Sequence, residues 1–211
     1  MSFIPSMYRL LNDVVKPWDQ LNGILSQPFA LQPDLSDVTR MATSLAIAIK
    51  HQADLRNAKR GVVDRESFEN RVMSDVADSA KHGDLRDSTR NNKLSVASCF
   101  EYANGRGFRF MRNSVTIEHA RLGELDFMAT SLAATQYWMK QIGFSLDRKL
   151  SVAESQAGFS SSASLYLAPQ HCINTAGIRL RFFERLANAT YRPVDPPQVK
   201  FELHEQPQHP H

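Results

Sequence analysis

A histidine, an aspartate and an arginine recur together at two places in the chain, and this pattern is the first sign of chemistry. The phrase KHQADLR covers residues 50–56 and the phrase KHGDLR covers residues 81–86. An imidazole can exchange a proton near neutral pH, and a neighbouring guanidinium can hold an anionic group. Two copies are too few for a repeat architecture. We therefore treat them as a motif pair, each copy closing a helical segment.

The second phrase supplies the strongest catalytic candidates. At about 3.6 residues per turn, Asp75 and His82 fall on one face of a helix, the face that also carries apolar residues. Asp75 could orient His82 as a general base, with Arg86 beside it for an anion and His51 contributed by the first phrase. The same pattern is typical of a structural polar ladder. Both interpretations predict that Asp75 is buried and hydrogen-bonded, because an unpaired buried carboxylate is too costly.

A metal site is the weaker interpretation of these residues. The spacings of His51 with Asp54 and of Asp78 with His82 could supply two ligands each. The Glu-x-x-His motif of di-iron bundles is absent. The sequence therefore predicts neither a metal nor another cofactor.

Basic residues interleaved with aromatic ones point to a third kind of chemistry. Between Lys50 and Arg112 the chain has 13 Lys and Arg against nine Asp and Glu. Arginines next to Phe108 and Phe110 could hold phosphates while the rings stack on bases. The alternative is a sheet whose arginines occupy its solvated face. The candidates for polyanion binding are Lys81, Arg86, Arg90, Lys93, Arg106, Arg109 and Arg112.

Three amphipathic segments that precede the strands are expected to be helices. Apolar residues recur at three and four positions over residues 6–26, 36–57 and 64–81. Pro17 should break or restart the first helix, because proline lacks a backbone N–H. Asp64 is predicted to cap the third helix. The short link before it predicts that the second and third helices pack as an antiparallel pair.

A β-hairpin should follow. Alternation from Leu94 to Tyr102 predicts a strand, and Asn104-Gly105 predicts a turn into a second strand that starts at Gly107. The pairs expected across a three-residue loop are Tyr102 with Phe108, Phe100 with Phe110, and Glu101 with Arg109. Between Phe110 and Val115 the apolar residues move from one set of alternate positions to the other, which predicts a bulge near Arg112-Asn113.

The second half of the chain adds a helix and further strands. Residues 123–142 are apolar on two sides, so this helix should be buried on two sides and end at Gly143. Short strands are expected over 164–167, 178–182 and 199–203. Because helices and strands are segregated, the expected fold is α+β: an N-terminal helical hairpin or bundle packed on a mainly antiparallel sheet with one buried helix. The expected organisation is a helical region over 1–93, a sheet with its helix over 94–205 and a disordered tail over 206–211.

Composition limits the class of protein. The 211 residues are 42% hydrophobic and 22% charged, which is average for a globular protein. The net charge of +3 permits nucleic-acid binding without requiring it. No apolar run approaches the about 18 residues of a membrane span, and no signal-peptide pattern is present. Cys99 and Cys172 are too few for a disulfide framework. A cytoplasmic location is expected.

The function predicted from these features is that of a binding protein. The chain has no P-loop, no Gly-x-Gly-x-x-Gly, no Gly-x-Ser-x-Gly and no paired Cys-x-x-Cys. These absences count against nucleotide hydrolysis, Rossmann redox chemistry and serine hydrolysis. The leading interpretation is a soluble binding or interaction protein whose ligand is nucleic acid or another polyanion. One alternative is a phosphodiesterase-like or ribonuclease-like hydrolase using His82, Asp75 and Arg86. Another is an assembly protein that binds a protein partner or a second copy of itself.

Overall fold

The computed structural model describes residues 3–28, 35–167 and 179–205. Contacts between residues divide the chain into two units, each built from several segments. Unit 1 comprises residues 1–22, 39–95 and 115–152, and unit 2 comprises residues 23–38, 96–114 and 153–211. The long strands β1 (Asn92–Ala103) and β2 (Gly107–His119) contribute residues to both units. The expected boundary at residue 93 stays a prediction, and Cys172 and the tail lie outside the described residues.

The first helix passes through Pro17 without a break. It consists of α1 (Phe3–Leu10), a π-helical turn η1 (Leu11–Val15) and α2 (Lys16–Leu25). In η1 the Lys16 N–H bonds to the Leu11 carbonyl, five residues earlier. A widened turn accommodates a residue that cannot donate a hydrogen bond and whose ring crowds the preceding turn. Of the two outcomes predicted at Pro17, the break does not occur, and the α-helix restarts at Lys16 after the π-turn.

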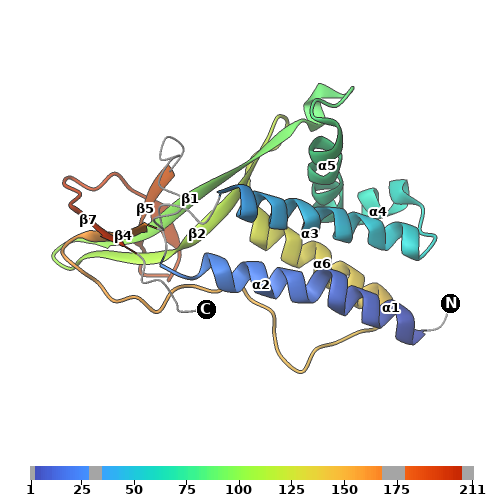
Figure 1. Ribbon diagram of the computed structural model, residues 1–211, viewed down its shortest axis with the longest axis horizontal. Coiled ribbons are helices and arrows are strands. Elements are labelled where there is room, and N and C mark those ends of the chain that lie inside the picture. Colours follow the sequence, from blue (N-terminus) through green and yellow to red (C-terminus); the bar gives the residue numbers. More distant parts are fainter. Residues whose placement is uncertain (1–2, 29–34, 168–178, 206–211) are drawn as a thin grey trace. The chain divides into compact units, whose positions relative to one another are not determined.

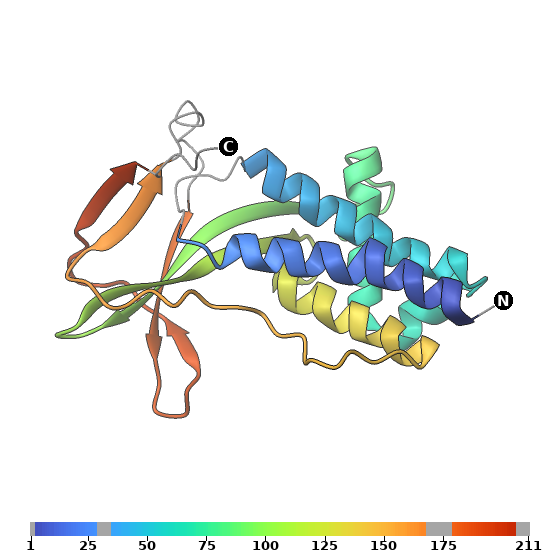
Figure 2. The same ribbon diagram turned by 60° about the horizontal axis from the view of Figure 1, so that its bottom comes forward.

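Helices α3 (Leu35–Leu55) and α6 (Phe127–Ile142) lie alongside the rod formed by α1 and α2 (Figures 1 and 2). The Trp18 indole N–H is 3.1 Å from Ser131 Oγ, which joins α2 to α6. As predicted, α6 ends at Gly143 and buries one stripe of Phe127, Ala134 and Trp138, whereas Leu132, Met139 and Ile142 of the other predicted stripe are only half-buried. It begins later than predicted because residues 123–126 form strand β3 (Gly123–Asp126), after which Asp126 caps the helix by accepting from the Ala129 N–H.

The link predicted between the second and third helices contains a helix of its own, α4 (Arg60–Glu66). The cap of α5 (Phe68–His82) is Ser67, which accepts from the Asn70 N–H, so the prediction of Asp64 as the cap is wrong. Both views show α5 running steeply across α3 instead of antiparallel to it (Figures 1 and 2). Its partner is α6, whose Trp138 indole donates to Asn70 at 2.7 Å. The extra helix redirects the chain, and the predicted antiparallel pair is not formed.

The main sheet has the strand order β3-β2-β1-β5-β6 and confirms the α+β class. The new strands are β5 (Arg179–Arg185) and β6 (Tyr191–Pro193). Pairs β2–β3 and β5–β6 are antiparallel, and β1–β5 is parallel. Strands β4 (Ala163–Leu167) and β7 (Phe201–Glu205) form a separate parallel pair. The sequence predicts strands close to β4, β5 and β7, the last two from their alternation, whereas the short β6 gave no signal. Among the described residues, no helix is both long and apolar enough to cross a membrane.

The register predicted for the β1–β2 hairpin is confirmed by its cross-strand contacts. The rings of Phe100 and Phe110 are 5.6 Å apart, the rings of Tyr102 and Phe108 are 5.2 Å apart, and Arg109 donates to Glu101 at 2.7 Å. These pairs fix which side chains of the hairpin face the core and which face its other side.

Further along β2 the register advances by one residue. Ser98 donates to Asn113 at 2.7 Å, whereas the register at the hairpin tip would place Arg112 opposite Ser98. The side chains of Ser98 and Asn113 can meet on the same side of the hairpin only if β2 carries one extra residue between Phe110, which pairs with Phe100, and Asn113. This contact supports the bulge predicted near Arg112-Asn113.

Candidate functional site

A cluster of charged side chains lies around Asp75 in unit 1. The Asp75 side chain is 2% exposed, and its Oδ1 accepts from Arg90 Nε at 2.6 Å. Its Oδ2 lies 3.2 Å from His119 Nε2. Arg90 is held in place by the short helix η2 (Ser88–Arg90), which Asp87 caps by accepting from the Thr89 N–H. The prediction of a buried, hydrogen-bonded Asp75 is confirmed, and its partners are Arg90 and His119.

The role of His119 follows from its tautomer. Its Nδ1 accepts from the Arg121 backbone N–H at 3.2 Å, so the ring proton is on Nε2 and is donated to Asp75. The imidazole is fully buried, and both of its nitrogens are engaged. His119 therefore joins the end of β2 to α5 and has no free nitrogen for a proton transfer.

Asp78, one turn after Asp75, extends the cluster to α3. It accepts from Lys50 and, at 3.0 Å, from Arg90 Nη2. Burial opposes ionisation of Asp78, but the bonds from Lys50 and Arg90 outweigh it, so the pKa of Asp78 is lowered. Burial likewise works against the charge of Arg90, and the two carboxylates reverse this effect and raise its pKa. The cluster is a fixed set of ion pairs linking α3, α5 and η2.

We expect Asp78 to make unit 1 sensitive to acid. Because its folded-state pKa is lowered, its ionised form stabilises the fold above about pH 4, and this contribution is lost as the pH falls through the folded-state pKa. Asp78→Asn should cost about 1–2 kcal/mol at pH 7 and progressively less towards pH 3. Urea unfolding at a series of pH values measures the difference. The exposed Asp84→Asn is the control, and a pH-independent effect of Asp78→Asn would contradict the assignment.

The candidate catalytic residues do not gather around Asp75. His82, Arg86 and His51 are exposed, and both oxygens of Asp75 are occupied by Arg90 and His119. Lys50 and Asp78 make the contact between the first phrase and α5. Within the described part of the chain, no three His, Cys, Asp or Glu side chains are grouped as a metal site would need. The hydrolase alternative stays a prediction.

The candidate polyanion-binding residues fall into three groups. Lys81, Arg86, Lys93 and Arg106 are exposed, Arg90 and Arg109 are held in ion pairs, and Arg112 is buried. Phe108 and Phe110 are core residues, packed with Phe100 and Ala163. Their rings cannot stack on bases, and this part of the sequence interpretation is wrong because these rings face the core side of the hairpin.

A pocket of about 670 Å³ opens in unit 2. Because β1 and β5 are parallel, their carboxyl ends meet at one edge of the sheet, where the β1–β2 and β5–β6 turns follow. The loop between α6 and β4 supplies the remaining wall. The residues that line the pocket include Tyr102, Arg106, Glu154, Phe159, Arg185 and Tyr191.

Backbone hydrogen bonds to β2 hold that loop in place. The Ser155 N–H bonds to the Met111 carbonyl at 2.6 Å, and Phe108 and Ser160 exchange two bonds at 2.7 and 2.8 Å. Gly107, with a φ of +88°, permits this approach, because a Cβ there would lie 1.9 Å from the Ser160 carbonyl oxygen. These contacts fix Glu154 and Phe159 at the pocket although their loop has no regular secondary structure.

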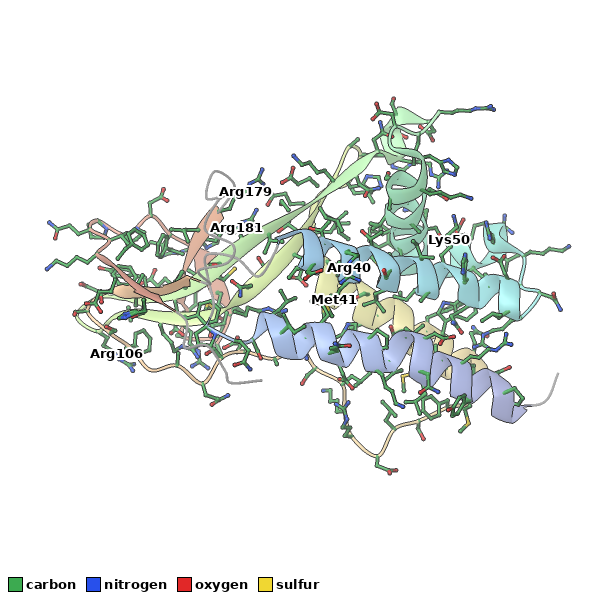
Figure 3. The ribbon with its side chains drawn as sticks, in the orientation of Figure 1. Arg40, Met41, Lys50, Arg106, Arg179 and Arg181 are labelled. Atoms are coloured by element: carbon green, nitrogen blue, oxygen red, sulfur yellow. The ribbon has the colours of Figure 1, made fainter. Side chains whose placement is uncertain are left out.

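Two guanidinium groups at the pocket carry unneutralised charge. Arg106, at the tip of the β1–β2 hairpin (Figure 3), places its Cζ 4.0 Å from the centroid of the Phe159 ring. Arg185, at the end of β5, is exposed. Among the described residues, neither has a carboxylate within ion-pair distance. The pocket therefore combines aromatic rings with two cations that can accept an anionic ligand.

Arg109 has the opposite role and joins the walls of the pocket. Its Nη2 donates to Glu101 at 2.7 Å and to Glu154 at 3.1 Å, and it lies 3.2 Å from the Tyr191 hydroxyl. Burial works against the charge of Arg109, and the bonds to the two glutamates outweigh it, so its pKa is raised. The pKa of Tyr191 is raised by burial and by the charges of Glu154 and Glu101, so the phenol keeps its proton.

Comparisons of the chain with protein-family models, with curated proteins and with solved structures find no match. The function is therefore inferred from the fold, the charged cluster around Asp75 and the pocket of unit 2. Sequence reasoning found Arg106 and Arg109 but missed His119, Glu154, Phe159, Arg185 and Tyr191. These residues lie far along the chain from their partners, and no spacing in the sequence connects them.

Proposed function

We propose that the protein binds single-stranded nucleic acid and holds one unpaired nucleotide at the pocket of unit 2. The observation that supports this proposal is the pairing of two unneutralised guanidinium groups, Arg106 and Arg185, with aromatic rings in one concave site. The volume of the pocket lies within the range found for small-ligand pockets, about 300–1,000 Å³. A base held in a duplex cannot enter such a pocket, whereas an unpaired base can.

Each part of the site matches a part of a nucleotide. The guanidinium plane of Arg106, backed by Phe159, forms a platform on which a base can stack. Arg185 provides a cation for a phosphate of the strand. Arg109 is neutralised by Glu101 and Glu154 and so keeps the walls in place. This assignment places stacking on Arg106 and Phe159, whereas the buried Phe108 and Phe110 only support the sheet.

Binding of a labelled single-stranded RNA 12-mer, measured by fluorescence anisotropy across a salt series, tests the proposal. Arg185→Ala should reduce the log–log salt slope by about 0.7, the value for one phosphate contact on a single strand. Arg106→Ala should weaken binding about tenfold, since it removes the stacking platform as well as a charge. A duplex of the same sequence should bind more weakly than the single strand.

The double variant Lys81→Ala/Arg86→Ala serves as the matched control, because it removes two exposed cations from the second phrase. It should leave the affinity and the salt slope nearly unchanged. If this variant loses binding while Arg106→Ala does not, the binding site lies at the end of α5. Absence of binding by the wild-type protein at low salt would overturn the proposal.

A further inference from the structure

We infer that the pocket reads the Watson–Crick edge of the unpaired base, that it prefers guanine, and that Glu154 determines this preference. The inference rests on the proposed function and adds a ligand identity to it. It comes from the two polar groups that Arg109 holds side by side on the pocket wall, the Glu154 carboxylate and the Tyr191 hydroxyl.

Glu154 is the exposed glutamate of the pocket wall that shares its Arg109 donor with the Tyr191 hydroxyl, and it has accepting capacity to spare. Glu101 is buried and accepts from Nε and Nη2 of Arg109, and Glu184 is paired with Arg192 at 2.6 Å, away from Arg109 and Tyr191. Glu154 accepts from Arg109 through Oε2, and its side chain is 39% exposed. An ionised carboxylate offers about four lone-pair sites and donates nothing. It therefore favours a ligand edge that presents N–H donors.

Guanine is the base whose edge presents two adjacent donors, the N1–H and the 2-amino group. Adenine and cytosine offer one amino group each, and uracil offers one imino N–H. The carbonyl O6 of guanine lies beside its N1–H and needs a donor. Tyr191 can supply it, because its hydroxyl accepts from Arg109 and retains its own proton. The wall thus offers both groups that the edge of guanine requires, an acceptor for its two N–H donors and a donor for O6, and Arg109 contacts both of them.

The platform and the wall belong to the same pocket. Phe159 and Glu154 lie on one loop, which Ser155 and Ser160 tie to β2 through backbone hydrogen bonds. A base stacked on Arg106 at one side of the pocket can therefore turn its edge towards Glu154 without a rearrangement of the loop. The hydrogen bonds at the wall then determine which base is preferred. Stacking does not distinguish the bases, because every base has a ring face that can stack.

Binding of RNA heptamers with the sequence UUUXUUU, where X is guanine, inosine, adenine or uracil, tests the inference. The wild-type protein should bind the guanine heptamer about tenfold more tightly than the adenine or uracil heptamer. Inosine, which lacks the 2-amino group, should fall between them. Glu154→Gln keeps the shape of the side chain and removes its charge, and it should reduce the guanine preference to less than about twofold while binding of the all-uracil heptamer is retained.

Glu184→Gln removes the same charge at the rim of the pocket and serves as the matched control, with the guanine preference expected to be intact. Equal affinity of the wild-type protein for all four heptamers, together with a loss on Arg106→Ala, would overturn the inference and leave the proposed function standing. A guanine preference that survives Glu154→Gln would also overturn it. Thermal unfolding of each variant verifies that the pocket is folded in the binding assays.

Discussion

Asp75→Ala should lower the free energy of unfolding of unit 1 by about 3 kcal/mol. The substitution leaves the His119 Nε2–H, which is fully buried, without an acceptor, and it removes one of the two carboxylates that bind Arg90. A buried donor without a partner costs about 1–3 kcal/mol, and the lost ion pair adds to this cost. The contribution of Arg90 is the smaller one, because its side chain is 38% exposed and keeps Asp78.

Urea unfolding followed by tryptophan fluorescence measures this effect, because Trp18 and Trp138, the two tryptophans of the chain, both belong to unit 1. Asp75→Asn keeps an oxygen that can accept from His119, so its loss should be smaller than that of Asp75→Ala. The exposed Asp84→Ala should change stability by less than about 0.5 kcal/mol. A loss below about 1 kcal/mol for Asp75→Ala would show that the cluster is not the link between α5 and β2 that its contacts indicate.

Asp75 also shows which features of the structure sequence periodicity can predict and which it cannot. The spacing of a helix places Asp75 on the buried face of α5, and the structure confirms its burial. The identity of its partner could not be predicted in the same way. His119 is 44 residues away, at the far end of a strand whose register advances by one residue near Asn113. Such a shift reverses the side of the sheet that each later side chain faces, so the direction of His119 depends on a local irregularity.

The contacts of the β1–β2 hairpin could likewise be predicted from the sequence, whereas the pocket beside it could not. Loop length and cross-strand pairing are local rules, and they predicted the contacts of Tyr102 with Phe108 and of Glu101 with Arg109. The pocket depends on a parallel pairing of β1 with β5 and on a loop without periodicity. Phe159 stands in a serine-rich stretch, where nothing in the sequence distinguishes a ring at a binding site from a ring in a loop.

Gly107 is the residue at which this long-range arrangement depends most on a single position. Gly107→Ala should destabilise the hairpin of unit 2 by about 3 kcal/mol, because the new Cβ would meet the Ser160 carbonyl oxygen at 1.9 Å and because a φ of +88° is strained for alanine. The two backbone bonds between Phe108 and Ser160 should break, and Phe159 should leave Arg106. Single-strand binding should therefore fall about tenfold.

Gly105→Ala is the matched control for this substitution, since Gly105 has a φ of +76° and a Cβ there would meet nothing within 4 Å. It carries the backbone strain without the collision, so it should cost about 1 kcal/mol and leave binding nearly intact. Amide hydrogen exchange separates the two variants, because the Phe108 N–H that bonds to Ser160 should exchange much faster in Gly107→Ala alone. Equal exchange and equal binding in the two variants would mean that the contact with Ser160 does not hold the loop, and the platform formed by Arg106 and Phe159 would then need another support.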